Sequence, residues 1–384
     1  MIYFDQAASS FPKPPEVGEA MMYALNEAGA NPGRGSHKLA RRAANLIQET
    51  RERASYIFGC TDPKKALFYP NATAALNQAI KGFPLKTGDH VIASSFEHNS
   101  IRRPLEYVKK QKGIDVTYVK WEDDSDQFIH NVKKAMTADT KLIVMTHASN
   151  VTGAILPIEE VTKLAHDNSI STLIDGSQTA GHTEINMKEQ DIDMLAFPGH
   201  KGLLGPQGTG MLLVNGEIQL EPIHHGGTGA HSESIDQPEQ WPERYESGTL
   251  NTPGIAGFNA ALKQVEKRQN GNVPRETLLA KQLVTGLKSL PGITCYGPDE
   301  HQPRVPITAF NVRNVSSQEV AMILDSHYDI AVRAGLHCSP LGHESLDTTE
   351  QGVVRASLGI YNTEAEVRAF LEAIKEIGSA YEQI

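Results

Sequence analysis

Short apolar runs, each closed by glycine or polar residues, fill the middle of the chain from Gly88 onward. Segments long enough for a helix separate most of them, and the runs lie at 90–93, 116–119, 142–145, 172–174, 194–197 and 211–214. Apolar runs without alternation are typical of strands buried on both faces, and helix-length connections are typical of parallel strands. The pattern therefore predicts a mostly parallel sheet covered by helices.

Helix spacing replaces this pattern towards both ends of the chain. Val17, Met21 and Leu25 recur about one helical turn apart near the start. Two capping-box signals predict helix starts in the last quarter: Ser316 with Glu319, and Thr363 with Glu366.

After Gly254 the short apolar runs give way to apolar residues at helix spacing, and this change predicts two domains in an α/β protein. We expect a large domain over residues 14–255, built on the mostly parallel sheet, and a smaller α+β domain formed by residues 1–13 and 256–384. In open α/β sheets ligands bind beyond the carboxyl ends of the strands, so the residues that follow each run are the candidates for function.

Polar residues follow several of the predicted strands. His98, Asn150, Asp175, Gln178, His200 and Lys201 all lie at or after such strand ends. Thr73 lies in a turn that opens a helix, where free backbone N–H groups favour a phosphate. Taken singly, such residues are ordinary caps and surface charges. Their co-occurrence predicts pyridoxal phosphate: the lysine forms a Schiff base, the aspartate keeps the ring nitrogen protonated, and the helix start holds the phosphate.

Charge and cysteine content narrow the class of protein. The 384 residues include 36 Lys and Arg against 46 Asp and Glu, a net charge of −10, which argues against broad nucleic-acid binding. No stretch approaches the ~20 apolar residues of a membrane span. Three scattered cysteines, Cys60, Cys295 and Cys338, form neither a disulfide framework nor a zinc site. We therefore expect a cytoplasmic protein with reduced thiols.

A histidine-containing, glycine-rich stretch could suggest a metal. His224, His225 and His231 fit no standard zinc spacing, and no cysteine or paired carboxylate lies nearby. We therefore predict that these histidines cluster in a loop and bind no metal ion.

The chain resembles the class V aminotransferase family. Residues 197–201 (FPGHK) are similar to its pyridoxal-lysine segment, and residues 333–338 (RAGLHC) are similar to the catalytic-cysteine loop of group II cysteine desulfurases. Further similar segments lie at 96–99, 149–153, 175–178, 246–249 and 355–362. The resemblance implies a fold type I pyridoxal-phosphate transferase that works as a homodimer.

The resemblance also implies a role for each matching residue. Lys201 would carry the cofactor, Asp175 would pair with its ring nitrogen, His98 would stack on its ring, and Gln178 would bind its phenolic oxygen. Thr73 and His200 would hold the phosphate, with Thr249 reaching in from a second subunit. Asn150, Arg355 and Arg333 would bind the substrate. This chain departs from the family at Pro198, where relatives usually have serine, and at Ala72 and Ala74, where relatives often have Thr and Glu; these changes concern the phosphate.

Cys338 distinguishes between the reactions that pyridoxal phosphate supports. Cys60 and Cys295 lie in apolar segments as small packed side chains. Cys338 follows His337 and Arg333 in a polar loop, where cationic neighbours favour the reactive thiolate, although the residues alone leave an inert loop thiol open. With the resemblance, the prediction is a cysteine desulfurase that converts L-cysteine to L-alanine and leaves a persulfide on Cys338. A sulfur-acceptor protein or a small thiol is then implied.

Three alternatives stay open. A selenocysteine lyase uses a similar site on L-selenocysteine, and a class V aminotransferase would need no Cys338. A non-catalytic scaffold would lose Lys201 or Asp175, and both are present.

Glu344, Asp347 and Glu350 form an acidic loop that could meet a basic acceptor surface, or could simply be solvated.

Overall fold

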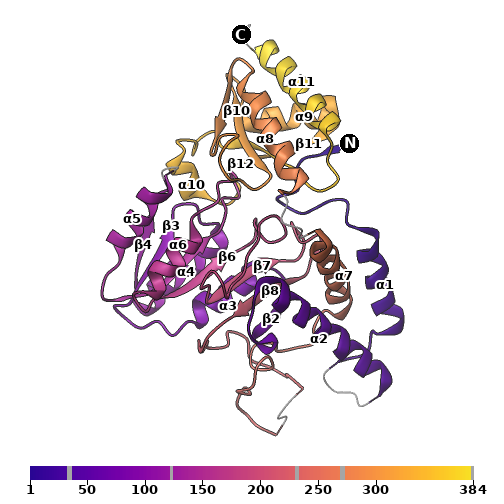
Figure 1. Ribbon diagram of the computed structural model, residues 1–384, viewed down its shortest axis with the longest axis vertical. Helices are drawn as coiled ribbons and strands as arrows, with labels where there is room; N and C mark the ends of the chain where they lie inside the picture. Colours follow the sequence, from indigo (N-terminus) through magenta and orange to yellow (C-terminus); the bar gives the residue numbers. More distant parts are fainter. Residues whose placement is uncertain (33–36, 122–123, 230–232, 269–272, 382–384) are drawn as a thin grey trace.

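A seven-stranded sheet forms the centre of the larger part of the molecule (Figure 1). The computed structural model describes residues 1–32, 37–121, 124–229, 233–268 and 273–381. The strand order is β2 (Ala66–Tyr69), β8 (Gly210–Val214), β7 (Met194–Pro198), β6 (Ser171–Asp175), β5 (Thr140–Thr146), β3 (His90–Ser94) and β4 (Asp115–Val119). The strands from β7 to β4 pair in parallel, whereas β8 is antiparallel to both β7 and β2. The prediction of an α/β fold with a mostly parallel sheet is confirmed.

Helices cover both faces of this sheet. They are α2 (Lys38–Phe58), α3 (Ala72–Gly82), α4 (Asn99–Lys112), α5 (Ser125–Ala135), α6 (Ile158–His166) and α7 (Thr252–Arg268), with a short 3-10 turn at Pro63–Lys65; α1 (Pro15–Glu27) packs on the outer side of α7. Along β7, Leu195 and Phe197 pack into the core under α2 and α7, while Met194 and Ala196 pack into the core under α3 and α4. Both faces of the strand are therefore buried. None of the helices in the described ranges is long and apolar enough to cross a bilayer.

The smaller part of the molecule has its own antiparallel sheet. Its strands are β12 (Arg333–Gly335), β13 (Val353–Ser357), β10 (Ile307–Val312) and β9 (Ile293–Tyr296), in that order. The remaining elements are α8 (Arg275–Lys288), α9 (Ser317–Tyr328), β11 (Ile330–Ala331), α10 (Pro340–Ser345) and α11 (Glu364–Tyr381). Phe310 and Phe370 meet edge to face in its core, with ring centroids 5.9 Å apart. This core is separate from the two cores of the large sheet.

The N-terminal segment and α7 connect the two parts. β1 (Ile2–Tyr3) pairs in parallel with β11, so the start of the chain joins the small part, as Figure 1 shows. Phe258 and Leu262 of α7 pack in the core of the large sheet. The division at residue 255 stays a prediction, and α7, which crosses that residue, packs on the large sheet.

Candidate active site

A pocket of about 500 Å³ opens at the carboxyl ends of the parallel strands. Its lining comes from the ends of β5, β6 and β7 and from the first turns of α3 and α4. The lining residues are Asn71, Ala72, Thr73, His98, Ser100, Thr146, Asn150, Asp175, Ser177, Gln178, Pro198, His200 and Lys201. The pocket therefore lies where a ligand is expected from the rule that ligands bind beyond strand ends.

Lys201 and Asp175 lie together in the pocket and perturb each other. Burial lowers the pKa of Lys201 to about 8, although the nearby Asp175 carboxylate opposes that shift. Burial raises the pKa of Asp175, while the Ser177 side chain and backbone and Lys201 hold it down. The Ser177 N–H donates to Asp175 Oδ1 at 2.9 Å. A lysine with a lowered pKa has a larger fraction of neutral, nucleophilic amine near neutral pH.

His98 is fixed by the helix that it caps. Its Nδ1 accepts from the Ser100 N–H at 3.0 Å and lies 2.9 Å from Ser100 Oγ. The acceptor role at Nδ1 places the ring proton on Nε2. Burial, together with the charges of Lys201 and Arg333, lowers the pKa of His98 to about 4. The pocket therefore contains a neutral imidazole of fixed orientation.

The first turn of α3 forms the polar end of the pocket. Asn71 caps this helix by accepting from the Ala74 N–H at 2.9 Å, and Thr73 Oγ1 lies 2.7 Å from Ser100 Oγ. Gly210 of β8 passes so close that an added Cβ would lie 2.7 Å from the Asn71 carbonyl carbon, so this position requires glycine. A helix start with two hydroxyls beside it is suited to a phosphate.

These groups fit pyridoxal phosphate. His200 Nδ1 is buried and has no hydrogen-bond partner among the described residues. His200 lies in the same pocket as Thr73 and Ser100, and these three residues can bind a phosphate. The buried carboxylate of Asp175 lies beside Lys201, where it can pair with a protonated ring nitrogen. Pro198 also lines the pocket, but it has no hydroxyl or N–H with which to bind an anionic group. In this chain Ser100 and His200 are the pocket residues that can donate hydrogen bonds to such a group in place of a serine at 198.

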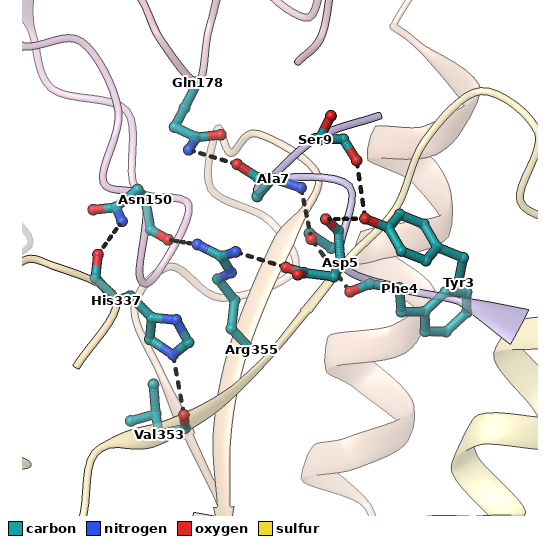
Figure 2. A network of polar contacts seen from close by, with 11 residues as sticks. Tyr3, Phe4, Asp5, Ala7, Ser9, Asn150, Gln178, His337, Val353 and Arg355 are labelled. Atoms are coloured by element: carbon teal, nitrogen blue, oxygen red, sulfur yellow. Dashed lines mark hydrogen bonds and ion pairs between the residues drawn. The ribbon is translucent and has the colours of Figure 1, made fainter. Parts of the chain in front are cut away.

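A second group of polar residues, from the small sheet, the Cys338 loop and the N-terminal segment, contacts the pocket residues Asn150 and Gln178 (Figure 2). Arg355 of β13 donates from Nη1 to the Asn150 carbonyl at 2.9 Å and from Nη2 to Asp5 Oδ1 at 2.8 Å. Asn150 Nδ2 donates to the His337 carbonyl at 2.7 Å. Gln178 Nε2 donates to the Ala7 carbonyl at 3.2 Å. Residues far apart in the sequence are thus joined to the pocket residues Asn150 and Gln178 by these hydrogen bonds.

Cys338 is exposed on a loop that contacts the start of α4. His337 and Cys338 both have positive φ, 48° and 60°, a conformation that non-glycine residues rarely adopt. The Asn99 N–H donates to the Cys338 carbonyl at 2.8 Å, and Ser339 Oγ donates to the Phe96 carbonyl at 3.3 Å. These contacts attach the loop to the helix that His98 caps.

The structure brings most of the predicted site residues into one place. Seven of them line the pocket: Thr73, His98, Asn150, Asp175, Gln178, His200 and Lys201. Arg355 joins them through Asn150, and Arg333 lies opposite Arg355 on the neighbouring strand. Thr249 does not line this pocket; it lines a separate cavity with Asn31 and Gln48. The roles of these residues stay predictions.

Sequence reasoning missed four polar residues of the site. Thr146 is the last residue of β5 and Ser177 lies between Asp175 and Gln178, so the strand-end rule could have found both. Ser100 and Asp5 carry no comparable signal, because their positions depend on α4 capping and on the path of the N-terminal segment.

The described residues contain no group of three or more potential metal ligands. His231, the third histidine of the glycine-rich stretch, lies outside the described residues.

Comparisons with known proteins agree with this geometry. Residues 2–370 match the family described as aminotransferase class-V. A probable cysteine desulfurase from Methanothermobacter thermautotrophicus is 34% identical over 98% of this chain and 94% of its own. The cysteine desulfurase of Escherichia coli O157:H7 is 31% identical over 98% of this chain and 93% of its own. An apo structure of cysteine desulfurase from Thermococcus onnurineus superposes with a TM-score of 0.91 at 32% identity, covering 99% of this chain and 95% of that one.

Proposed function

Because the chain belongs to the class-V aminotransferase family, we propose that it is a pyridoxal-phosphate-dependent cysteine desulfurase. The observation that carries this proposal is the position of the exposed Cys338 loop. The Cys338 carbonyl accepts a hydrogen bond from the Asn99 N–H at the start of α4. Asn99 directly follows His98, which lines the same pocket as Lys201. A general aminotransferase has no use for a thiol held there.

The pocket residues would hold the cofactor at both of its ends. Lys201 would form the covalent link to the cofactor aldehyde, and Asp175 would pair with the ring nitrogen. Thr73, Ser100 and His200 would hold the phosphate, and the neutral His98 ring would pack on the pyridine ring. When bound, pyridoxal phosphate supplies an electron sink for the substrate Cα.

The chain's own groups then bind the amino acid and move its protons. Arg355 and Asn150 hold the substrate carboxylate, because a guanidinium fork matches a carboxylate. The neutral Lys201 amine would remove the Cα proton of the substrate; its pKa of about 8 suits a base near neutral pH. The Cys338 thiolate attacks the substrate sulfur, the carbon–sulfur bond breaks, and its electron pair stays with the carbon that becomes alanine. The persulfide remains on Cys338 until a second thiol accepts the outer sulfur.

Three further features belong to the proposal. Thr249 binds the phosphate of a second subunit, and its position in a cavity apart from its own Lys201 supports a homodimer. A sulfur acceptor meets the loop of Glu344, Asp347 and Glu350, which are all exposed near Cys338 in sequence. The three cysteines are free, which supports a reducing compartment such as the cytoplasm.

The first experiment measures alanine and sulfide released from L-cysteine in the presence of a reducing thiol. We expect Cys338→Ala to abolish both products while the visible absorbance of the bound cofactor is unchanged. Cys295→Ala, which removes a thiol from β9 in the small sheet, is the matched control and should keep wild-type turnover.

Three outcomes would contradict the proposal. Equal turnover in wild type and Cys338→Ala would remove the thiol from the mechanism. Turnover of L-selenocysteine without turnover of L-cysteine would indicate a selenocysteine lyase, and a requirement for a keto acid would indicate an aminotransferase.

A further inference from the structure

Two protein groups hold the Arg355 guanidinium from opposite sides, as Figure 2 shows. Nη1 donates to the Asn150 carbonyl and Nη2 to Asp5 Oδ1, at 2.9 and 2.8 Å. The Arg355 side chain is only 2% exposed, and its Nε has no partner among the described residues. A guanidinium has five N–H donors, so these two contacts leave three donors for another acceptor. The arrangement orients the group without saturating it.

Asp5 is itself held firmly by the backbone around it. The Ser357 N–H donates to the Phe4 carbonyl at 2.7 Å, and Tyr3 Oη donates to the Asp5 carbonyl at 3.2 Å. Asp5 and Ser357 form a parallel bridge, so Asp5 lies two residues along β13 from Arg355. The Asp5 side chain is 21% exposed, which leaves it partly shielded from solvent. A carboxylate fixed in this way can set the direction of the guanidinium.

Asn150 extends the same chain of contacts to the Cys338 loop. Arg355 holds the Asn150 carbonyl, and Asn150 Nδ2 donates to the His337 carbonyl at 2.7 Å. His337 and Cys338 both have positive φ, so the loop depends on contacts of this kind to keep its conformation. His337 Nε2 also lies 3.1 Å from the Val353 carbonyl of β13, the strand that carries Arg355.

We propose that Asp5 is a positioning residue: it directs the Arg355 guanidinium at the substrate carboxylate and, through Arg355 and Asn150, keeps the Cys338 loop aligned with the same substrate. The inference rests on the proposed cysteine desulfurase function. Asp5 touches neither substrate nor cofactor; it acts through the guanidinium.

Three variants of Asp5 separate its geometry from its charge. Asp5→Ala removes the acceptor, and kcat/KM for L-cysteine should fall about 10- to 100-fold, mainly through KM, as expected for a lost hydrogen bond to a charged group. Asp5→Asn keeps an oxygen at the same place and should recover most of that loss. Asp5→Glu keeps the charge but moves the carboxylate by one methylene, and kcat/KM should fall again.

Asp329→Asn is the matched control. Asp329 pairs with the amino group of Met1 at 2.6 Å, so the control removes a carboxylate that holds the same terminal segment but lies away from Arg355. Its kcat/KM should remain at the wild-type value. The cofactor absorbance should be unchanged in all four variants.

A second measurement does not require turnover. Alkylation of Cys338 by iodoacetamide, followed in the apoprotein, should change in rate with Asp5→Ala and remain unchanged with Asp329→Asn. The proposal is overturned if Asp5→Ala keeps kcat/KM and the alkylation rate within about twofold of wild type. It is also overturned if Asp5→Ala and Asp5→Asn both lower KM, because Asp5 would then compete with the substrate. If wild type releases no alanine from L-cysteine, the proposed function fails, and the alkylation rates still decide whether Asp5 positions the loop.

Discussion

At the scale of single residues, burial sets the protonation of the pocket. The same loss of hydration that lowers the pKa of Lys201 to about 8 also lowers that of His98 and of His200 to about 4. Both imidazoles are therefore neutral at physiological pH and act as hydrogen-bonding and packing groups. Lys201, in contrast, changes its charge near neutral pH.

This leads to a prediction about the apoprotein. Because the pKa of Lys201 is lowered from 10.5 to about 8, its neutral form is already present in quantity above about pH 8. Trace acetylation of the apoprotein over pH 6–11.5, followed for the Lys201 peptide by mass spectrometry, should give a midpoint near 8. A free peptide amine acetylated in the same tubes controls for loss of reagent. A midpoint at the ordinary value of 10.5 would mean that the pocket admits water freely.

At this scale the sequence predicts the residues better than their partners. Lys201, Asp175 and His98 are identified by strand ends and by the family resemblance. The Ser100 contacts with both His98 and Thr73 could not be predicted, because they depend on the side-chain directions of two helix starts.

At the scale of elements, a buried ion pair attaches α2 to the segment that carries Thr249. Arg51 donates to both oxygens of Glu246 at 2.9 and 2.8 Å, and the two side chains are 4% and 6% exposed. Glu246 Oε1 also accepts from the Phe68 N–H of β2 at 2.7 Å. The pair therefore joins a helix, an edge strand and a loop.

Breaking one side of this pair should be costly. Arg51→Met leaves the Glu246 carboxylate buried and without its cation, and the free energy of unfolding of the apoprotein in urea should fall by about 3–5 kcal/mol. Arg368→Met, which breaks an exposed pair with Glu364, is the control and should cost less than about 1 kcal/mol. Equal effects of the two substitutions would contradict the assignment of Arg51 as a buried anchor.

The elements themselves were largely predictable, because their signals are local. All six apolar runs form strands, and both capping boxes start helices: Ser316 accepts from the Glu319 N–H, and Thr363 and Glu366 bond each other reciprocally. β2 was not predicted. It has four residues, and its partner β8 lies more than a hundred residues away in the sequence.

At the scale of the whole molecule, Glu97 couples the stability of the large sheet to pH. This carboxyl is fully buried and accepts from the Ser94 and Thr146 N–H groups, so it joins the ends of β3 and β5. Burial raises the pKa of Glu97 to about 8 from an ordinary 4.5. The folded protein therefore holds this proton more tightly than the unfolded chain does.

The sign of the pH effect follows from this shift. The stabilisation is fully present below about pH 4.5 and is lost as pH rises through about 8. The thermal midpoint of wild type should therefore fall between pH 6.5 and 8.5 more than that of Glu97→Gln, which has no carboxyl to ionise. The buried histidines, whose pKa values are lowered in the folded state, contribute equally to both proteins and therefore cancel in the comparison. Parallel curves for the two proteins would contradict the prediction, because they would show that Glu97 does not change its ionisation in this pH range.

The overall architecture could be predicted from the sequence, but the contacts that join its two ends could not. The mostly parallel sheet, the small second sheet and the family follow from patterns and motifs within short segments. Asp5 meeting Arg355 joins residues 350 positions apart, and no local pattern specifies such a contact.

That separation has a consequence for the order in which the protein is made. At roughly 5–20 residues per second, Asp5 is added to the chain roughly 20–70 s before Arg355. Every residue that lines the Lys201 pocket lies between 71 and 201, so the nascent chain contains all of these lining residues long before it contains the guanidinium. Because Cys338 is also added late, the segment that contacts the start of α4 and the arginine that holds Asn150 both join the pocket residues only when synthesis is nearly complete.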